Sequence, residues 1–166
     1  THRDVISALE INLSCPNVEA AGVGGMKKQE RILEVVKAVR EGTKLLTFAK
    51  LSPELGDILA IGEQVLKQGI DGLSVTNTLR GMSVDITSRR SRLAKDFGGL
   101  SGPAIKPVAL RYVYQVKKEL KVPVIASGGI MTVQDALEFL IVGADLLAVG
   151  TANFVESAVT LEILKG

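Results

Sequence analysis

The chain has 166 residues, of which 46% are hydrophobic and 23% are charged, a composition typical of one globular α/β domain and not of a disordered segment. Its 20 basic and 18 acidic residues leave a net charge of +2, so nothing indicates a nucleic-acid partner. No apolar run approaches the roughly 20 residues needed to cross a bilayer, and the single cysteine forms no internal disulfide. We therefore expect a cytoplasmic protein without a membrane partner.

Apolar runs alternate with amphipathic stretches along the whole chain. The apolar runs predict five strands, at residues 5–13, 45–51, 72–77, 122–126 and 146–149. The amphipathic stretches predict five helices, at residues 29–40, 55–67, 103–120, 132–142 and 154–164. Pro103 or Pro107 opens the third helix, and Thr132 caps the fourth. The alternation predicts an α/β domain with a parallel sheet, right-handed crossovers and a buried first strand.

Residues 79–101 form an atypically long connection between the third strand and the next helix. The segment is basic and rich in glycine, and it exceeds the roughly 2 to 6 residues usual for such a loop. A long insertion usually carries function, and a tolerated surface excursion is the alternative. We expect its arginines to form a solvated face: Arg80, Arg89, Arg90 and Arg92.

Polar side chains follow the first three strands, at the edge where the reactive groups of α/β folds gather. Cys15 lies between Asn12 and Asn17 after the first strand, and Asn77 follows the third. A thiol there can reach a substrate, and amides can orient a planar, hydrogen-bonding ligand. In the alternative interpretation, Cys15 is a small buried residue and its two asparagines close a turn.

Lys50 lies near the carboxyl end of the second strand, in an otherwise apolar run. An ammonium group is rarely buried in such a place without a partner. Lys50 could neutralise an anionic flavin or enolate, or it could serve as a Schiff-base amine. Pairing with a nearby acid at the rim of the sheet is the alternative.

Glycine-containing turns follow the last two strands. Gly128 and Gly129 come after the fourth strand, and Gly150 and Thr151 come after the fifth. Glycine lets backbone N–H groups approach a phosphate closely, and a helix N-terminus favours negative charge. Either turn alone is a weak indication, because glycine is common in turns. Together they predict a phosphate site of the kind that (β/α)8 barrels build after their final strands.

Six motifs in order resemble the class 1 dihydroorotate dehydrogenases, most closely the class 1B catalytic subunit. They are Asn-Leu-Ser-Cys-Pro-Asn (12–17), Ala-Lys-Leu-Ser-Pro (49–53), Thr-Asn-Thr-Leu-Arg-Gly-Met (76–82), Gly-Gly-Leu-Ser-Gly-Pro-Ala-Ile-Lys-Pro (98–107), Ser-Gly-Gly-Ile (127–130) and Val-Gly-Thr-Ala (149–152). The similar dihydropyrimidine dehydrogenases usually have a histidine after Ser-Cys-Pro. Asn17 therefore favours dihydroorotate over another dihydropyrimidine.

The resemblance implies a (β/α)8 TIM-type barrel that binds FMN and oxidises dihydroorotate to orotate in pyrimidine biosynthesis. Cys15 would remove the C5 proton while hydride passes from C6 to N5 of FMN, because a thiol with a reference pKa near ~8.5 is a better base than a serine hydroxyl. The residues implied to hold the pyrimidine are Asn12, Asn17, Asn77 and Thr78. Those implied to contact FMN and its phosphate are Lys50, Ser101, Gly102, Gly128, Gly129, Gly150 and Thr151.

The resemblance also implies partners and a larger barrel. Class 1B enzymes pair with a subunit that carries FAD and an iron–sulfur cluster and passes electrons to NAD, and this chain has no cysteine cluster for a metal centre. Residues 1–166 resemble an FMN-binding barrel from its fourth strand onward, whereas a full barrel needs ~250 residues. We expect edges at residues 5–13 and 146–149, about three more βα units before Thr1, a helical extension after Gly166, and a homodimer. A non-catalytic half-barrel that binds phosphate or a partner is the alternative.

Overall fold

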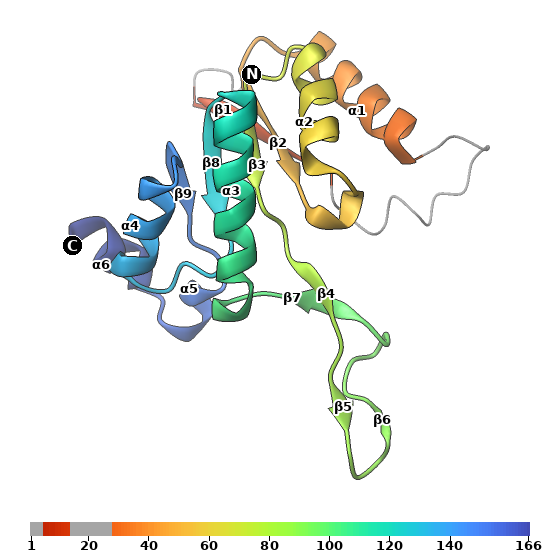
Figure 1. Ribbon diagram of the computed structural model, residues 1–166, viewed down its shortest axis with the longest axis vertical. Helices are drawn as coiled ribbons and strands as arrows, with labels where there is room; N and C mark the ends of the chain where they lie inside the picture. Colours follow the sequence, from red (N-terminus) through yellow and green to blue (C-terminus); the bar gives the residue numbers. More distant parts are fainter. Residues whose placement is uncertain (1–4, 14–27) are drawn as a thin grey trace.

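The computed structural model describes residues 5–13 and 28–166. Within them, one parallel sheet of five strands runs in the order β1-β2-β3-β8-β9 (Figure 1). These strands are β1 (Ala8–Asn12), β2 (Leu46–Leu51), β3 (Gly72–Val75), β8 (Val124–Ser127) and β9 (Leu146–Ala148). Their order in space follows their order along the chain, which is the connectivity of part of a (β/α)8 barrel. The predicted parallel sheet is confirmed, and so are its two edges, β1 and β9.

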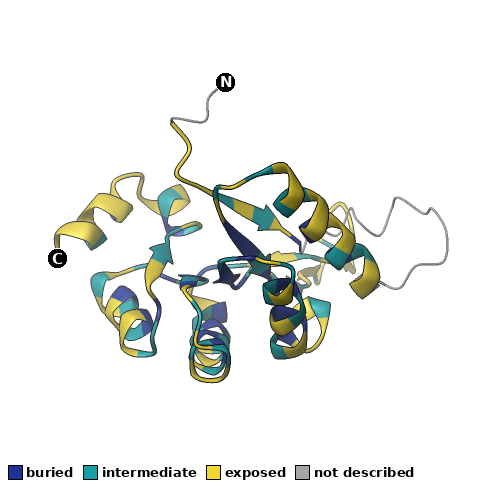
Figure 2. Ribbon diagram, turned by 90° about the horizontal axis from the view of Figure 1, so that it is seen from above, coloured by how far each residue is buried: buried dark blue, intermediate teal, exposed yellow. Residues whose placement is uncertain are grey.

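Helices connect the strands and lie along the convex side of the curled sheet (Figure 2). The four that separate successive strands are α1 (Lys28–Gly42), α2 (Ile58–Lys67), α3 (Lys106–Leu120) and α4 (Val133–Ile141). The capping box that Thr132 and Asp135 form at the start of α4 confirms the predicted N-cap. Among the helices of the described residues, none is both long and apolar enough to cross a membrane.

The hydrophobic core lies between the sheet and these helices. Alternate strand residues such as Leu51, Leu73 and Val124 point to it, and each is fully buried. Val113 of α3 and Phe139 of α4 pack against them from the helices. Each such side chain stabilises the fold by about 1.5–3 kcal/mol through loss of its contact with water. The intervening strand residues face the opposite, concave side of the sheet, which leaves that side for function.

Three predicted elements differ from the structure. The first strand is parallel to β2, as predicted, but it is not buried, because an edge strand has one neighbour and β1 alternates between exposed and half-buried residues. The second helix starts at Ile58, since Asp57 caps it and a 3₁₀ turn, η3 (Pro53–Leu55), precedes it. The predicted last helix is two helices, α5 (Ala152–Val155) and α6 (Val159–Lys165), because Glu156 adopts an extended conformation between them.

The long insertion forms an antiparallel arm that extends away from the sheet (Figure 1). It contains β4 (Leu79–Gly81), β5 (Val84–Asp85), β6 (Arg90–Ser91) and β7 (Gly98–Leu100), with β4 paired to β7 and β5 to β6. The sequence predicted no strands here, since pairs of two or three residues leave no periodic pattern. Its four arginines are exposed, as predicted.

Candidate active site

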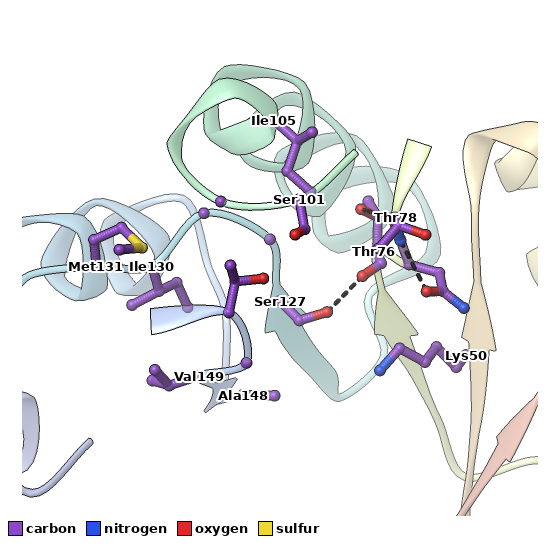
Figure 3. A pocket seen from close by; sticks show the side chains of 16 residues that line it. Lys50, Thr76, Thr78, Ser101, Ile105, Ser127, Ile130, Met131, Ala148 and Val149 are labelled. Atoms are coloured by element: carbon purple, nitrogen blue, oxygen red, sulfur yellow. Dashed lines mark hydrogen bonds between the residues drawn. The ribbon is translucent and has the colours of Figure 1, made fainter. Parts of the chain in front are cut away.

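A cavity of about 300 Å³ opens at the carboxyl ends of β2, β3, β8 and β9 (Figure 3). The turn that precedes α3, η4 (Pro103–Ile105), closes another side. The residues that line it are Lys50, Thr76, Asn77, Thr78, Ser101, Gly102, Ile105, Ser127, Gly128, Gly129, Ile130, Met131, Ala148, Val149, Gly150 and Thr151. Five separate segments of the chain therefore converge on one space.

The cavity brings together most of the residues that the sequence singled out. Those that line it are Lys50, Asn77, Thr78, Ser101, Gly102, Gly128, Gly129, Gly150 and Thr151. Asn12 reaches it through a hydrogen bond to Asn77. Cys15 and Asn17 lie outside the described residues. Strand-end position was thus a good guide to proximity, while the roles of these residues remain predictions.

Two asparagines are hydrogen-bonded to each other at the carboxyl ends of β1 and β3. The Asn77 Nδ2 group donates a hydrogen bond to Asn12 Oδ1 at 3.2 Å. The Thr78 backbone N–H donates to Asn77 Oδ1 at 2.8 Å, which fixes which end of this amide carries the oxygen. Held in this way, the two amides form a polar wall that can donate and accept hydrogen bonds at the edge of a heterocycle.

Lys50 lines the cavity and pairs with a nearby acid, the alternative interpretation of its position, while its role toward a flavin remains a prediction. In the register of the sheet it lies opposite Asn12 of β1 and Ser74 of β3, so its side chain points to the concave face. Figure 3 shows it reaching toward the cavity from β2. Its Nζ lies 3.2 Å from Oε1 of Glu10, and the side chain is 22% exposed. Glu10 stands two residues before Asn12, so strand alternation could have identified this partner.

The floor of the cavity joins the ends of β3 and β8. The Ser127 hydroxyl, which is buried, donates to the Thr76 carbonyl at 2.5 Å (Figure 3). The Thr76 hydroxyl in turn donates to the Asn77 carbonyl at 2.9 Å. These bonds tie the polar wall to the loop after β8. Both residues lie in motifs quoted above, but sequence reasoning did not single them out, because a Ser or Thr at a strand end equally suits a simple turn.

The glycines after β8 adopt conformations that other residues avoid. Gly128 and Gly129 have φ angles of +123° and +82°, and Gly102 has +79°. A Cβ placed on Gly129 would lie 2.8 Å from both the Gly102 carbonyl oxygen and Cβ of Lys106. The loop after β8 therefore presses its bare backbone against the turn before α3, whereas a Cβ on Gly150 would meet nothing within 4 Å. The backbone of Gly102, Gly128, Gly129 and Gly150 lines the cavity, and we call it the backbone cradle.

Apolar side chains form the rest of the cavity wall. These are Ile105, Ile130, Met131, Ala148 and Val149. Sequence reasoning missed them because an apolar residue beside a strand is expected in the core in any case. Lys50 carries the only formal charge among the described residues that line the cavity. An apolar wall, hydroxyl groups, one cation and glycine backbone are the groups that a ring carrying a phosphate would need.

This architecture defines part of a (β/α)8-type barrel with a ligand cavity at the carboxyl ends of its strands. Comparison with known families then gives a specific assignment. The family model described as dihydroorotate dehydrogenase matches residues 2–166. The chain belongs to the dihydroorotate dehydrogenase family.

The similar proteins are catalytic subunits of dihydroorotate dehydrogenase B (NAD(+)). The chain is 50% identical over 163 residues to the one from Desulforamulus reducens, covering 98% of this chain and 54% of that protein. It is 48% identical over 161 residues to the one from Alkaliphilus metalliredigens, with 97% and 53% covered. For the Shouchella clausii protein the values are 45% over 160 residues, with 96% and 53% covered. The chain thus spans about half the length of the curated relatives it matches.

Proposed function

We propose that this chain supplies the cofactor and substrate site of an FMN-dependent dihydroorotate dehydrogenase, which oxidises dihydroorotate to orotate in pyrimidine biosynthesis. One observation carries the proposal. In a member of this family, the polar and glycine residues after four successive strands line a single cavity. Parallel strands bring these ends to one edge in any case, so the cavity between them, lined by a cation, an amide and hydroxyl groups, is what favours a ligand site over a solvated rim.

The groups that line the cavity are of the kinds that would bind FMN. The backbone of Gly128, Gly129 and Gly150, with the hydroxyl of Thr151, would suit the phosphate, because amide N–H groups at strand ends bind anions. The apolar wall suits the flavin ring. Lys50 would supply a positive charge beside that ring, with its ammonium group held by Glu10. Ser101 and Gly102 also line the cavity.

The substrate would lie against the amide wall. Asn12, Asn17, Asn77 and Thr78 offer donors and acceptors to the pyrimidine edge and would hold C5 near Cys15. Cys15 would take the C5 proton. The electron pair of the broken C5–H bond then forms the C5=C6 double bond as hydride leaves C6. FMN supplies the acceptor for that hydride. The proton and the hydride together account for the two hydrogens by which dihydroorotate exceeds orotate.

The names of the relatives suggest which partner would reoxidise the reduced flavin. They are named as NAD(+)-type catalytic subunits, so we propose that electrons leave through a separate subunit with FAD and an iron–sulfur cluster, and then reach NAD. We also propose a homodimer. A cytoplasmic location is consistent with the lone cysteine of this chain.

Anaerobic mixing of the full-length native protein with two dihydropyrimidines tests the proposal. Dihydroorotate should bleach the flavin absorbance and yield one orotate per flavin, whereas dihydrouracil should leave the spectrum unchanged. Reduction by dihydrouracil instead would indicate a dihydropyrimidine dehydrogenase. A colourless protein that binds no added FMN would indicate a non-catalytic module and overturn the proposal.

A further inference from the structure

One carboxylate links the cavity loop to the helices behind it. Asp135 on α4 accepts hydrogen bonds at Oδ2 from the backbone N–H groups of Met131 and Thr132, both at 2.9 Å. Met131 lines the cavity and follows directly after the loop that contains Gly128 and Gly129. The position of this carboxylate therefore sets the position of the loop's end.

The other oxygen of the same carboxylate holds the start of α3. The Lys106 ammonium lies 2.6 Å from Asp135 Oδ1 and 2.9 Å from Glu138 Oε1. The Lys106 side chain is 25% exposed and that of Asp135 13%, so the pair is largely shielded from water. A single bridge thus connects the turn before α3 with the loop after β8.

Both segments that the bridge joins carry cavity glycines. Gly129 packs so closely on Lys106 that an added Cβ would lie 2.9 Å from the Lys106 backbone nitrogen, and 2.8 Å from the carbonyl oxygen of Gly102. Gly102 and Gly129 both line the cavity, whereas Lys106 does not. Any change in the distance between α3 and α4 at this end would therefore move one wall of the backbone cradle relative to the other.

The pair stays charged near neutral pH. The hydrogen bonds that the Lys106 ammonium donates to Asp135 and then to Glu138 raise the pKa of Lys106 above its usual 10.5. Burial pushes the pKa of Asp135 upward, but the hydrogen bonds from Lys106, Met131 and Thr132 outweigh it and leave that pKa below 3.8. The bridge is thus intact at the pH at which a flavin enzyme works.

We propose that Lys106 and Asp135 are positioning residues, which set the spacing of Gly102 and Gly129 and thereby the affinity of the cavity for the phosphate of FMN. The inference rests on the proposed function, and it assigns to this bridge a role in cofactor affinity that neither residue exerts by touching the ligand.

The chain offers a matched control at the far end of the same helix. Lys117 of α3 lies 2.6 Å from Oδ2 of Asp145, and Asp145 also accepts a backbone hydrogen bond, from Val124 N–H at 2.8 Å. This second pair has the same chemistry and joins α3 to the start of β9. It stands at the amino ends of the strands and contributes no residue to the cavity.

The test measures FMN and riboflavin binding to full-length apoprotein by flavin fluorescence. Lys106→Met should weaken FMN binding roughly tenfold, the scale on which supporting residues act on a bound group. Lys117→Met should leave it unchanged although both variants lose an ion pair. Riboflavin, which lacks the phosphate, should bind to Lys106→Met as to the wild type, and Lys106→Arg should restore FMN affinity.

A second variant separates positioning from a simple effect of charge. Asp135→Asn keeps an acceptor oxygen for Met131 and Thr132 but removes the carboxylate nearer to Lys106, which then keeps only Glu138 as an ionic partner. Positioning predicts weaker FMN binding. If Lys106 acted by its charge on the phosphate, loss of the acid would strengthen binding and overturn the inference. If Lys106→Met does not fold, the FMN affinity of Asp135→Asn alone tests the positioning role.

The two proposals fail in different ways. Equal FMN affinity in the Lys106 and Lys117 variants, or equal weakening of FMN and riboflavin, would overturn the positioning role alone. Failure of the wild-type apoprotein to bind FMN would overturn the proposed function itself.

Discussion

The side-chain amide of Asn77 donates a hydrogen bond to Oδ1 of Asn12 across 3.2 Å, joining the carboxyl ends of β1 and β3 over the intervening β2. The two residues are 65 positions apart in the sequence. Lys50 of β2 lies directly opposite Asn12 in the register. A pyrimidine held by this wall would therefore be within reach of groups from three strands.

Loss of the Asn77 amide should weaken orotate binding. Asn77→Ala removes one of the two amides and the hydrogen bond that it donates to Asn12. Orotate affinity should fall by about 1–3 kcal/mol. FMN content should stay at the wild-type level. Spectral titration of the oxidised full-length protein with orotate measures both quantities, and Gln29→Ala, which removes an exposed amide pair with Gln64, serves as control. Loss of FMN with normal orotate affinity would show that Asn77 serves the cofactor.

Strand order made much of this site predictable. The carboxyl ends of parallel strands lie at one edge of a sheet, so the sequence predicts that Lys50, Asn77 and Gly128 lie close together. The same logic predicts the two edge strands, whereas the cap at Thr132 follows from the preference of threonine for helix N-termini. What it could not give was the exact partner of each polar group, such as the acceptance of the Ser127 proton by the Thr76 carbonyl, because that depends on side-chain rotamers.

Other features lay beyond sequence reasoning for different reasons. Met131 and Ile105 look like core residues by pattern alone, and only the turn before α3 brings Ile105 to the cavity. The strands of the arm are only two or three residues long, and β4 and β7 depend on pairing between residues about 20 positions apart, as in Leu79 with Leu100. The break between α5 and α6 follows from the extended backbone at Glu156, which no breaker residue marks.

Cys15 is expected to act as the base. Cys15→Ser should slow flavin reduction by dihydroorotate by roughly 10²-fold or more and move the optimum to higher pH, because a hydroxyl gives up its proton far less readily than a thiol. Stopped-flow reduction of the full-length protein measures the rate. Reoxidation of chemically reduced FMN, which needs no base, is the internal control. Unaltered reduction kinetics would reject the role.

Two glycines of the cradle should respond differently to alanine. In Gly129→Ala, alanine must adopt the positive φ of this position, and its Cβ would lie 2.8 Å from the Gly102 carbonyl oxygen. The substitution should therefore destabilise the apoprotein by about 1–3 kcal/mol. Gly150→Ala meets nothing within 4 Å and should leave apoprotein stability unchanged. If the phosphate of FMN lies against the backbone of Gly150, the added methyl group of Gly150→Ala should lower FMN affinity. Chemical denaturation and FMN titration separate the two effects, and equal stability losses would contradict the geometry.

Acid should weaken the ion pair at the far end of α3. The hydrogen bonds from Lys117 and Val124 hold the pKa of Asp145 below its usual 3.8. Because the folded pKa is lower than the unfolded one, the pair stabilises the protein above about pH 4 and this contribution disappears as the pH falls through the folded pKa. The Tm difference between wild type and Asp145→Asn should therefore shrink as the pH is lowered below 4. Glu63→Gln, which breaks an exposed i,i+4 pair with Lys67, should give a small difference throughout.

A crystal structure of the full-length native protein with FMN and orotate tests the central claim most directly. The account predicts the phosphate against the backbone of 128–129 and 150–151, the flavin ring beside Lys50, and orotate against Asn12, Asn17, Asn77 and Thr78 with C5 facing Cys15. FMN bound outside this cavity, or orotate away from the asparagines, would contradict it.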